Sequence, residues 1–142
     1  MHGVSIGEAS RQSGVKVPTI RYYEQIGLLP EAPRTTSNRR LYGKGELNRL
    51  AFIRHARELG FEVDAIRTLS ALQDSPEQSC VAADAIATAR LADVEQRIRS
   101  LLALKAELQR MISECSHGRV GDCRVIEILA DHDHCLANHA KA

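Results

Sequence analysis

Three cysteines in this chain have the residue type and the placement to hold a metal ion. Cys80 precedes a long segment with helical apolar periodicity, Cys115 follows it, and Cys123 lies eight positions further on. Cysteine thiolates are strong ligands for zinc and for softer metal ions. In a chain that we expect to be cytoplasmic, cysteines are more often metal ligands or redox thiols than disulfides. Taken alone, Cys115 fits a small residue packed on a helix seam equally well.

One long helix is expected to position these thiols. Its apolar residues recur at spacings of three, four and seven, with Lys105 as the polar interruption and Cys115 on the next seam position. The 35 positions from Cys80 to Cys115 span roughly 50 Å of helix, so these two thiols cannot meet within one straight helix. An antiparallel partner would bring Cys80 beside Cys115 and Cys123 of the partner subunit, which predicts a homodimer with a thiolate site at each end. The seam residues are Leu91, Val94, Ile98, Leu101, Leu108 and Ile112.

Charge is distributed unevenly along the chain, although the net charge is only +1. Residues 1–70 carry 11 Lys and Arg against 7 Asp and Glu, whereas residues 71–142 carry 8 against 11. Between Arg11 and Arg57 the balance is 10 basic against 3 acidic residues. A basic front half joined to an acidic back half indicates a nucleic-acid reader attached to a unit of another kind. No run of residues is apolar and long enough to span a membrane, and we expect no membrane partner.

Two short helices with a tight turn between them are predicted near the N-terminus. Ser5 and Glu8 have the spacing of a capping box that opens the first helix, and Gly14 ends this helix. Pro18 fits the first turn of the second helix, which Gly27 closes. Two such helices are typical of a helix-turn-helix motif.

The remainder of the chain is predicted to be helical apart from one extended stretch. Residues 33–42 predict a small β-ribbon, or wing. Helices are expected at about 44–59, 63–72 and 80–114, and a short apolar turn at 125–129. Aromatic residues are few, which argues against one thick globular core. The predicted fold class is therefore mainly α: an N-terminal winged helix-turn-helix followed by a long dimerisation helix that forms an antiparallel coiled coil.

Several short motifs together point to a known family. They lie at residues 6–9, 19–24, 27–29, 39–42, 52–54 and 59–61. The sequence IRYYE, which ends at Glu24, and the sequence RLY, which ends at Tyr42, are highly specific at this separation. On these motifs the chain resembles the MerR family of bacterial transcription regulators over nearly its whole length. The resemblance implies a winged helix-turn-helix, an antiparallel coiled-coil dimer with an effector site at each end, and no enzymatic activity.

The resemblance also implies a division of the chain into four segments. These are a winged helix-turn-helix DNA-binding domain at 1–74, a dimerisation helix at 75–114, a metal-binding loop with a short C-terminal helix at 115–130, and a tail rich in His and Asp at 131–142. The tail holds His132, His134 and Cys135. It fits an accessory metal-binding segment and a solvated chain end equally well.

The second helix of such a motif enters the major groove of DNA, where base edges can be told apart. Predicted groove contacts are Lys16, Thr19, Arg21 and Tyr22, and predicted phosphate contacts are Arg34, Arg39, Arg40, Tyr42 and Arg57. Phosphate contacts set affinity and register, whereas few side chains read sequence. Ile20 and Tyr23 are expected in the core instead, and Arg49 and Arg54 on a solvated helix face.

By resemblance, Cys115 and Cys123 flank the metal-binding loop. Family members that respond to zinc, cadmium, lead or mercury place a cysteine at the start of the long helix, where this chain has Cys80, whereas copper sensors have a serine there. The expected effector is therefore Zn²⁺ or another divalent thiophilic metal (Cd²⁺ or Pb²⁺), bound by Cys80, Cys115 and Cys123. His117 is a candidate fourth ligand. The alternative is a Cu⁺ sensor that uses Cys115 and Cys123 only.

The resemblance implies a cytoplasmic bacterial regulator that binds double-stranded promoter DNA as a homodimer. Metal binding would distort the DNA so that RNA polymerase engages both promoter elements, at a cost of a few kcal/mol. Two further classes remain open. A redox sensor of the family's iron–sulfur branch would crowd four cysteines into the loop, where this chain has two. A thiol enzyme or a metal-storage protein would not need the basic front half of the chain.

Overall fold

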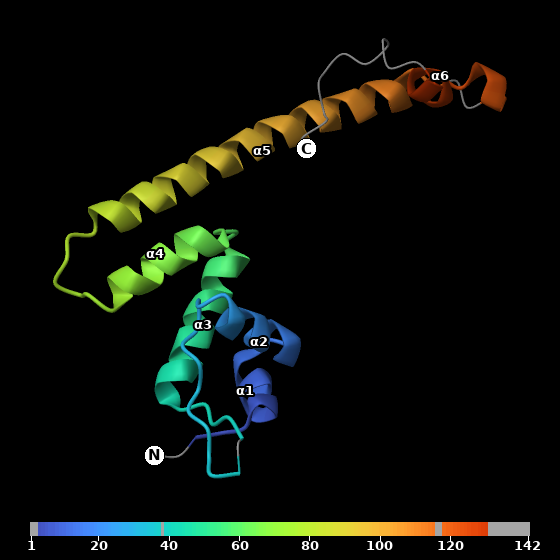
Figure 1. Ribbon diagram of the computed structural model, residues 1–142. Coiled ribbons are helices and arrows are strands. Elements are labelled where there is room, and N and C mark those ends of the chain that lie inside the picture. Colours follow the sequence, from blue (N-terminus) through green and yellow to red (C-terminus); the bar gives the residue numbers. More distant parts are fainter. Residues whose placement is uncertain (1–2, 38, 116–117, 131–142) are drawn as a thin grey trace. The chain divides into compact units, whose positions relative to one another are not determined.

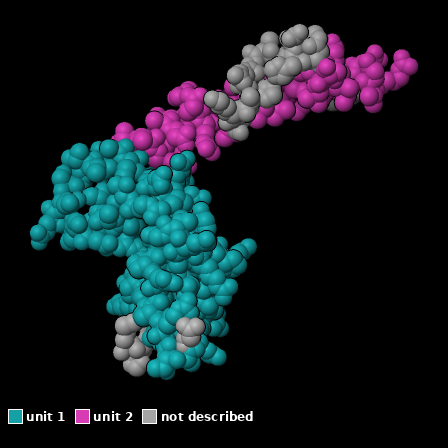
Figure 2. Space-filling model, in the orientation of Figure 1, with its two compact units in different colours: residues 1–87 teal, residues 88–142 magenta. Residues whose placement is uncertain are grey.

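A computed structural model of the protein describes residues 3–37, 39–115 and 118–130. Its helices are α1 (Ile6–Ser13), α2 (Val17–Gln25), α3 (Lys44–Glu58), α4 (Val63–Gln73), α5 (Val81–Ser113), the 3₁₀ turn η1 (Val120–Asp122) and α6 (Arg124–Ala130) (Figure 1). The predicted mainly α fold class is confirmed. The chain divides into two compact units, residues 1–87 and 88–142 (Figure 2). Within the described ranges, no helix is both long and apolar enough to cross a membrane.

The helix-turn-helix begins and ends where local sequence signals predict. Oγ of Ser5 accepts a hydrogen bond of 3.2 Å from the backbone N–H of Glu8 and so caps α1. Gly14 ends α1 in the left-handed region, with a φ of 74°, and a Cβ at this position would clash with the guanidinium of Arg54. Pro18 lies in the first turn of α2. α1 packs against both α2 and α3, so the predicted motif is present.

An apolar core holds the first unit together. Ile20, Leu50, Ile53 and Ile66 have no exposed surface, and each contributes about 1.5–3 kcal/mol by burial. Tyr23 is also buried, so the predicted core positions of Ile20 and Tyr23 are confirmed. The buried set is Ala9, Val15, Ile20, Tyr23, Leu28, Leu29, Ala32, Tyr42, Leu50, Ile53, Ala56 and Ile66. The core therefore draws on α1 to α4 and on the loop that leads into the wing.

The predicted wing is present as a loop with two antiparallel bridges, and the described residues form no continuous strand there. One bridge pairs Arg34 with Arg40, and the other pairs Val4, near the start of the chain, with Tyr42. Pro33 has no backbone N–H to donate, so the ladder cannot extend past Arg34. The wing is thus shorter than the predicted β-ribbon. Its second half is still paired at two points, at Arg40 and at Tyr42.

Two arginines of α3 connect helices, where the sequence predicted only a solvated helix face. The guanidinium of Arg49 donates to the carbonyl of Ser70 at 3.1 Å and pairs with Asp74 at the end of α4. Its side chain is only 14% exposed, so the prediction is wrong for Arg49. Arg54 is more exposed, but its guanidinium donates to the carbonyl of Ser13 at 2.9 Å. Both side chains satisfy carbonyl groups at the ends of neighbouring helices.

The second unit consists of most of α5 together with η1 and α6. The observed span of α5, Val81–Ser113, agrees with the predicted helix at 80–114. Among the apolar side chains described in this unit, Met111 and Ile128 are the buried ones. The seam residues Leu91, Ile98, Leu101, Leu108 and Ile112 are 48–62% exposed in the single chain. An apolar stripe of this length on one helix is typical of a surface that another helix covers.

Candidate functional site

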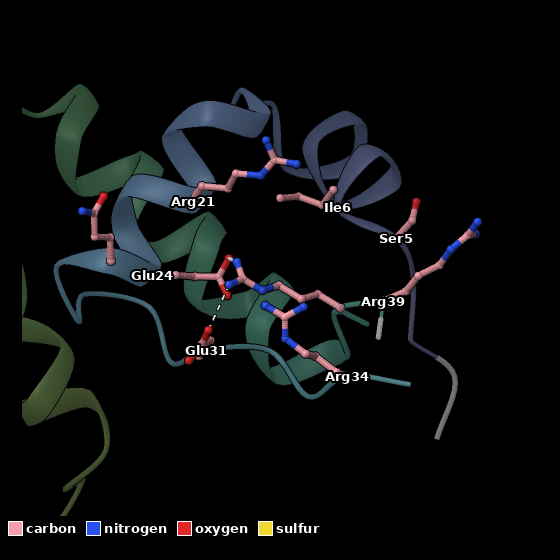
Figure 3. A pocket seen from close by; sticks show the side chains of 9 residues that line it. Ser5, Ile6, Arg21, Glu24, Glu31, Arg34 and Arg39 are labelled. Carbon is pink, nitrogen blue, oxygen red and sulfur yellow. Dashed lines mark hydrogen bonds and ion pairs between the residues drawn. The ribbon is translucent and has the colours of Figure 1, made fainter. Parts of the chain in front are cut away.

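A groove of about 840 Å³ lies between the start of α1, helix α2 and the wing (Figure 3). In Figure 3, Arg21 extends from α2, whereas Arg34 and Arg39 extend from the wing. The groove is lined by Ser5, Ile6, Arg21, Glu24, Gln25, Glu31, Arg34, Arg39 and Arg40. Four predicted DNA contacts, from the second helix of the motif and from the wing, therefore share one concave surface. A basic concave surface attracts the phosphates of a nucleic acid.

Glu24 fixes the wing to α2 at the floor of this groove. Its side chain is 3% exposed, and its carboxylate accepts hydrogen bonds from Nη1 of Arg40 at 3.1 Å and from the Tyr42 hydroxyl at 2.6 Å. It also accepts from the backbone N–H of Ala32 at 3.1 Å. Arg40 forms a second ion pair with Glu31 at 2.9 Å. The buried carboxylate is therefore fully engaged, and it orients both polar side chains of the RLY motif.

Tyr42 lies in a different environment from the one expected of a phosphate contact. It has no exposed surface, and burial together with the hydrogen bond to Glu24 raises its pKa to about 12. A buried hydroxyl that already donates to a carboxylate cannot reach a phosphate, so the predicted contact does not fit the structure. Burial lowers the pKa of Arg40, but attraction to Glu24 and its other neighbours outweighs this effect and raises it. Arg40 therefore remains charged and partly exposed beside the groove.

Three of the other predicted DNA contacts lie on a second surface of the same unit. Lys16, Thr19 and Arg57 line a smaller groove of about 410 Å³, together with Arg54. Tyr22 is half-exposed on α2. The structure thus divides the predicted contacts into a wing group and a group beside the turn of the helix-turn-helix, and it keeps all of them accessible except the buried tyrosine.

Sequence reasoning did not assign Glu24 and Glu31 to the site. A signal for them was available, because only 3 acidic residues occur between Arg11 and Arg57. An acidic residue in such a basic stretch is a candidate ion-pair partner for a nearby arginine. Two of the three acidic residues do pair with Arg40.

Cys115 and Cys123 come together beyond the end of α5. Their Sγ atoms are 3.9 Å apart, and both side chains are partly buried. Two sulfurs bound to one tetrahedral zinc ion, each at about 2.3 Å, are about 3.8 Å apart, whereas a linear pair at the same bond length would be about 4.6 Å apart. The observed separation lies near the tetrahedral value, and two thiols in ordinary contact have a similar separation, so the two sulfurs are close enough to bind one ion.

The other predicted ligands belong either to the first compact unit or to residues outside the described ranges. Cys80 is exposed and belongs to the first unit. His117 lies outside the described residues, as do the tail residues His132, His134 and Cys135. Among the described residues, no group of three His, Cys, Asp or Glu side chains of one chain could hold a metal ion.

The surroundings of Cys123 favour its thiolate form, which is the form that binds metal ions. Cys123 directly precedes α6. Backbone hydrogen bonds, first from Ile126 and then from Val125, lower the pKa of its thiol, and the Cys115 thiol adds a further hydrogen bond. Partial burial opposes this shift but does not cancel it.

Comparison with known protein sequences identifies the family. A family described as "MerR HTH family regulatory protein" matches residues 4–73, and one described as "MerR, DNA binding" matches residues 47–111. The transcriptional regulator HmrR of Sinorhizobium medicae is 40% identical over 127 residues, which cover 89% of this chain and 86% of the relative. The regulator ZntR of Escherichia coli is 39% identical over 128 residues, which cover 87% and 90% of the two chains.

Solved structures agree with this assignment. The regulator PbrR691 of Ralstonia metallidurans, in complex with lead(II), superposes with a TM-score of 0.77 at 36% identity and covers 89% of this chain and 98% of its own. The regulator MerR of Bacillus megaterium, in complex with mercury(II), gives a TM-score of 0.65 at 29% identity, with coverages of 89% and 99%. Matching family descriptions, relatives of about two-fifths identity and a shared fold lead to one conclusion. This chain belongs to the MerR family, whose members are transcription regulators and not enzymes.

Proposed function

We propose that this chain is a metal-responsive transcription regulator whose effector is a divalent thiophilic ion, Zn²⁺, Cd²⁺ or Pb²⁺. The observation that carries the proposal is the pair of thiols of Cys115 and Cys123, which are 3.9 Å apart and so close enough to bind one ion. The relatives support it. They include ZntR and the heavy metal-dependent transcription regulator 2 of Rhizobium meliloti, which is 38% identical over 128 residues.

The third ligand in this proposal is the partner subunit's Cys80. Helix α5, which is 33 residues or about 50 Å long, lies between Cys80 and Cys115 of one chain. Antiparallel pairing of the exposed seams in a homodimer brings Cys80 of the partner subunit to the loop, and the exposure of this thiol in the single chain leaves it available. Three thiolates suit zinc and its softer relatives, with His117 as a candidate fourth ligand. Two thiolates alone would favour Cu⁺, which is the competing outcome of the test below.

The groove between α2 and the wing is the proposed contact with promoter DNA. Arg21 would reach base edges, and Arg34 and Arg39 would bind phosphates. In the activating state the dimer would bend and untwist the promoter so that RNA polymerase engages both of its elements. Such distortion costs about 1–6 kcal/mol, so the effector must favour the activating state by a comparable amount. A regulator of this kind works where the DNA is, in the cytoplasm.

A competitive metal titration tests the metal site. Fully reduced wild type, Cys80→Ser and Cys135→Ser are each titrated with Zn²⁺, Cd²⁺, Pb²⁺ and Cu⁺. We expect one divalent ion per chain in wild type and in Cys135→Ser, the matched control, and loss of divalent binding in Cys80→Ser. Undiminished divalent binding by Cys80→Ser would remove Cys80 from the site. Equal Cu⁺ binding by wild type and Cys80→Ser, with weak zinc binding by both, would establish the copper sensor instead.

Salt-dependent DNA binding tests the groove. Each phosphate contact that is lost lowers the slope of log K against log[salt] by about 0.9. We therefore expect Arg34→Ala and Arg39→Ala each to lower the slope by about one contact, whereas Arg97→Ala, an exposed arginine of α5, should leave it unchanged. An equal decrease of the slope in all three variants would show that net charge, and not the groove, determines DNA binding.

A further inference from the structure

Two oppositely charged residues stand directly beside the loop cysteines. Glu114 precedes Cys115, and Arg124 follows Cys123. Nε of Arg124 donates to Oε2 of Glu114 at 2.7 Å, although the two residues are ten positions apart in the chain. Because this contact joins the immediate neighbours of both thiols, it closes the base of the loop. Across that base the two sulfur atoms face each other at 3.9 Å.

Glu114 and Arg124 each form a further hydrogen bond with a residue of the adjoining helix. The Glu114 carboxylate accepts a second hydrogen bond from Nη1 of Arg110 at 3.3 Å, and Arg110 in turn pairs with the buried Glu107 of α5. On the other side, Nη1 of Arg124 donates to Glu127 of α6 at 2.9 Å. An isolated surface ion pair contributes little because two long side chains must be ordered to form it. Here the ordering is shared by a network that runs from α5 to α6.

We propose that Glu114 and Arg124 are positioning residues that hold Cys115 and Cys123 at metal-binding separation before any ion arrives. A ligand pair that is already in place loses less conformational freedom on binding, so the ion is bound more tightly. The predicted effect on metal affinity rests on the proposed function. The effect on the thiol separation does not, since it requires no metal.

The first test measures how close the thiols are in metal-free protein. In a Cys80→Ser/Cys135→Ser background, only the two loop thiols remain, and dibromobimane becomes fluorescent when it joins them. We expect Arg124→Gln and Glu114→Gln to slow this cross-linking several-fold and Arg124→Lys, which can still donate to Glu114, to recover most of the rate. The matched control is Arg119→Gln. Arg119 lies in the same loop with its side chain 92% exposed, so its loss removes the same charge without opening the base.

The second test measures Zn²⁺ and Cd²⁺ affinity in the full chain with all cysteines present. We expect Arg124→Gln to weaken binding by about tenfold or more, as for other residues that orient metal ligands, and Arg119→Gln to change it little. Equal weakening by both variants would mean that charge alone acts and would overturn the proposal, as would unchanged cross-linking in Arg124→Gln. If wild type binds no metal while Arg124→Gln still slows cross-linking, the proposed function fails and the positioning role stands.

Discussion

The two compact units of this chain are stabilised in different ways. The first unit buries twelve apolar side chains in one core, and polar groups such as Glu24 and Arg49 connect its elements at the edge of that core. The second unit buries Met111 and Ile128 among its described apolar side chains, and the ion pair between Arg124 and Glu114 connects α6 to the end of α5. The first unit thus contains its own core, whereas the second unit exposes an apolar seam and carries two adjacent, partly buried thiols. Both features of the second unit are suited to further partners.

This difference matches the roles that we propose. A reading surface has to keep its shape, and a buried core with satisfied polar groups provides that. A sensing unit has to change its free energy when a ligand binds, and elements with few buried contacts have low local stability. Metal and partner would then supply part of the stabilisation that a core supplies elsewhere.

The largest contrast is expected between an apolar residue of the core and one of the seam. Ile53→Ala should lower the free energy of unfolding by about 2–5 kcal/mol, because the side chain has no exposed surface and its removal leaves a cavity. Leu101→Ala, on the exposed seam, should instead weaken dimerisation. Urea unfolding at two protein concentrations, with sedimentation equilibrium, separates the two effects. A seam variant with unchanged dimerisation would break the comparison.

Sequence reasoning succeeded where the signal was local. Ser5 and Gly14 set the ends of α1 through hydrogen bonds with residues three and four positions away, and the fixed backbone φ of Pro18 suits the first turn of α2. The helices could therefore be placed from the chain alone. It failed where a side chain acts over a long separation. Arg49 bonds a carbonyl 21 positions away, and Arg54 bonds one 41 positions away, and no periodicity reveals either contact.

The candidate site shows the same division. The cysteines flanking the loop were predicted as ligands from their residue type and from the family resemblance, and the structure adds their 3.9 Å separation. The burial of Tyr42 was not recognised, because an RLY motif does not show that the tyrosine turns towards Glu24, 18 positions earlier. Nor did the sequence show that Arg124 returns to Glu114, because their pairing depends on how the loop folds back.

A smaller effect is expected for polar contacts at the edge of the core. Arg49→Gln should lower the free energy of unfolding by about 1–3 kcal/mol, because the Ser70 carbonyl loses its charged donor in a partly buried place. The control, Arg97→Gln on α5, breaks an exposed ion pair with Asp93 and should stay within about 0.5 kcal/mol of wild type. Chemical denaturation of both variants measures this. Equal decreases in the free energy of unfolding would mean that ion pairs contribute equally to stability in the two units.

The smallest effect is expected for the hydroxyl of Tyr42, and it carries a pH signature. Tyr42→Phe should cost about 1 kcal/mol at neutral pH, because the Glu24 carboxylate loses one donor. The pKa of Tyr42 is raised from 10.0 to about 12 in the folded protein, so the folded state holds this proton more tightly than the unfolded state does. The resulting stabilisation is complete below pH 10 and is lost as the pH rises from 10 to 12.

The phenylalanine variant cannot lose this contribution, so the stability gap between wild type and Tyr42→Phe should shrink as the pH rises above 10. Unfolding free energies of both proteins, measured from neutral pH to about pH 11, give the gap directly and cancel the titration of all other groups. A gap that stays constant over this range would show that the hydroxyl is not held against Glu24. Of the Arg40 and Tyr42 side chains, only Arg40 would then connect the wing to Glu24. The proposed contrast between a rigid DNA-reading unit and an adaptable sensing unit would then be smaller at the wing.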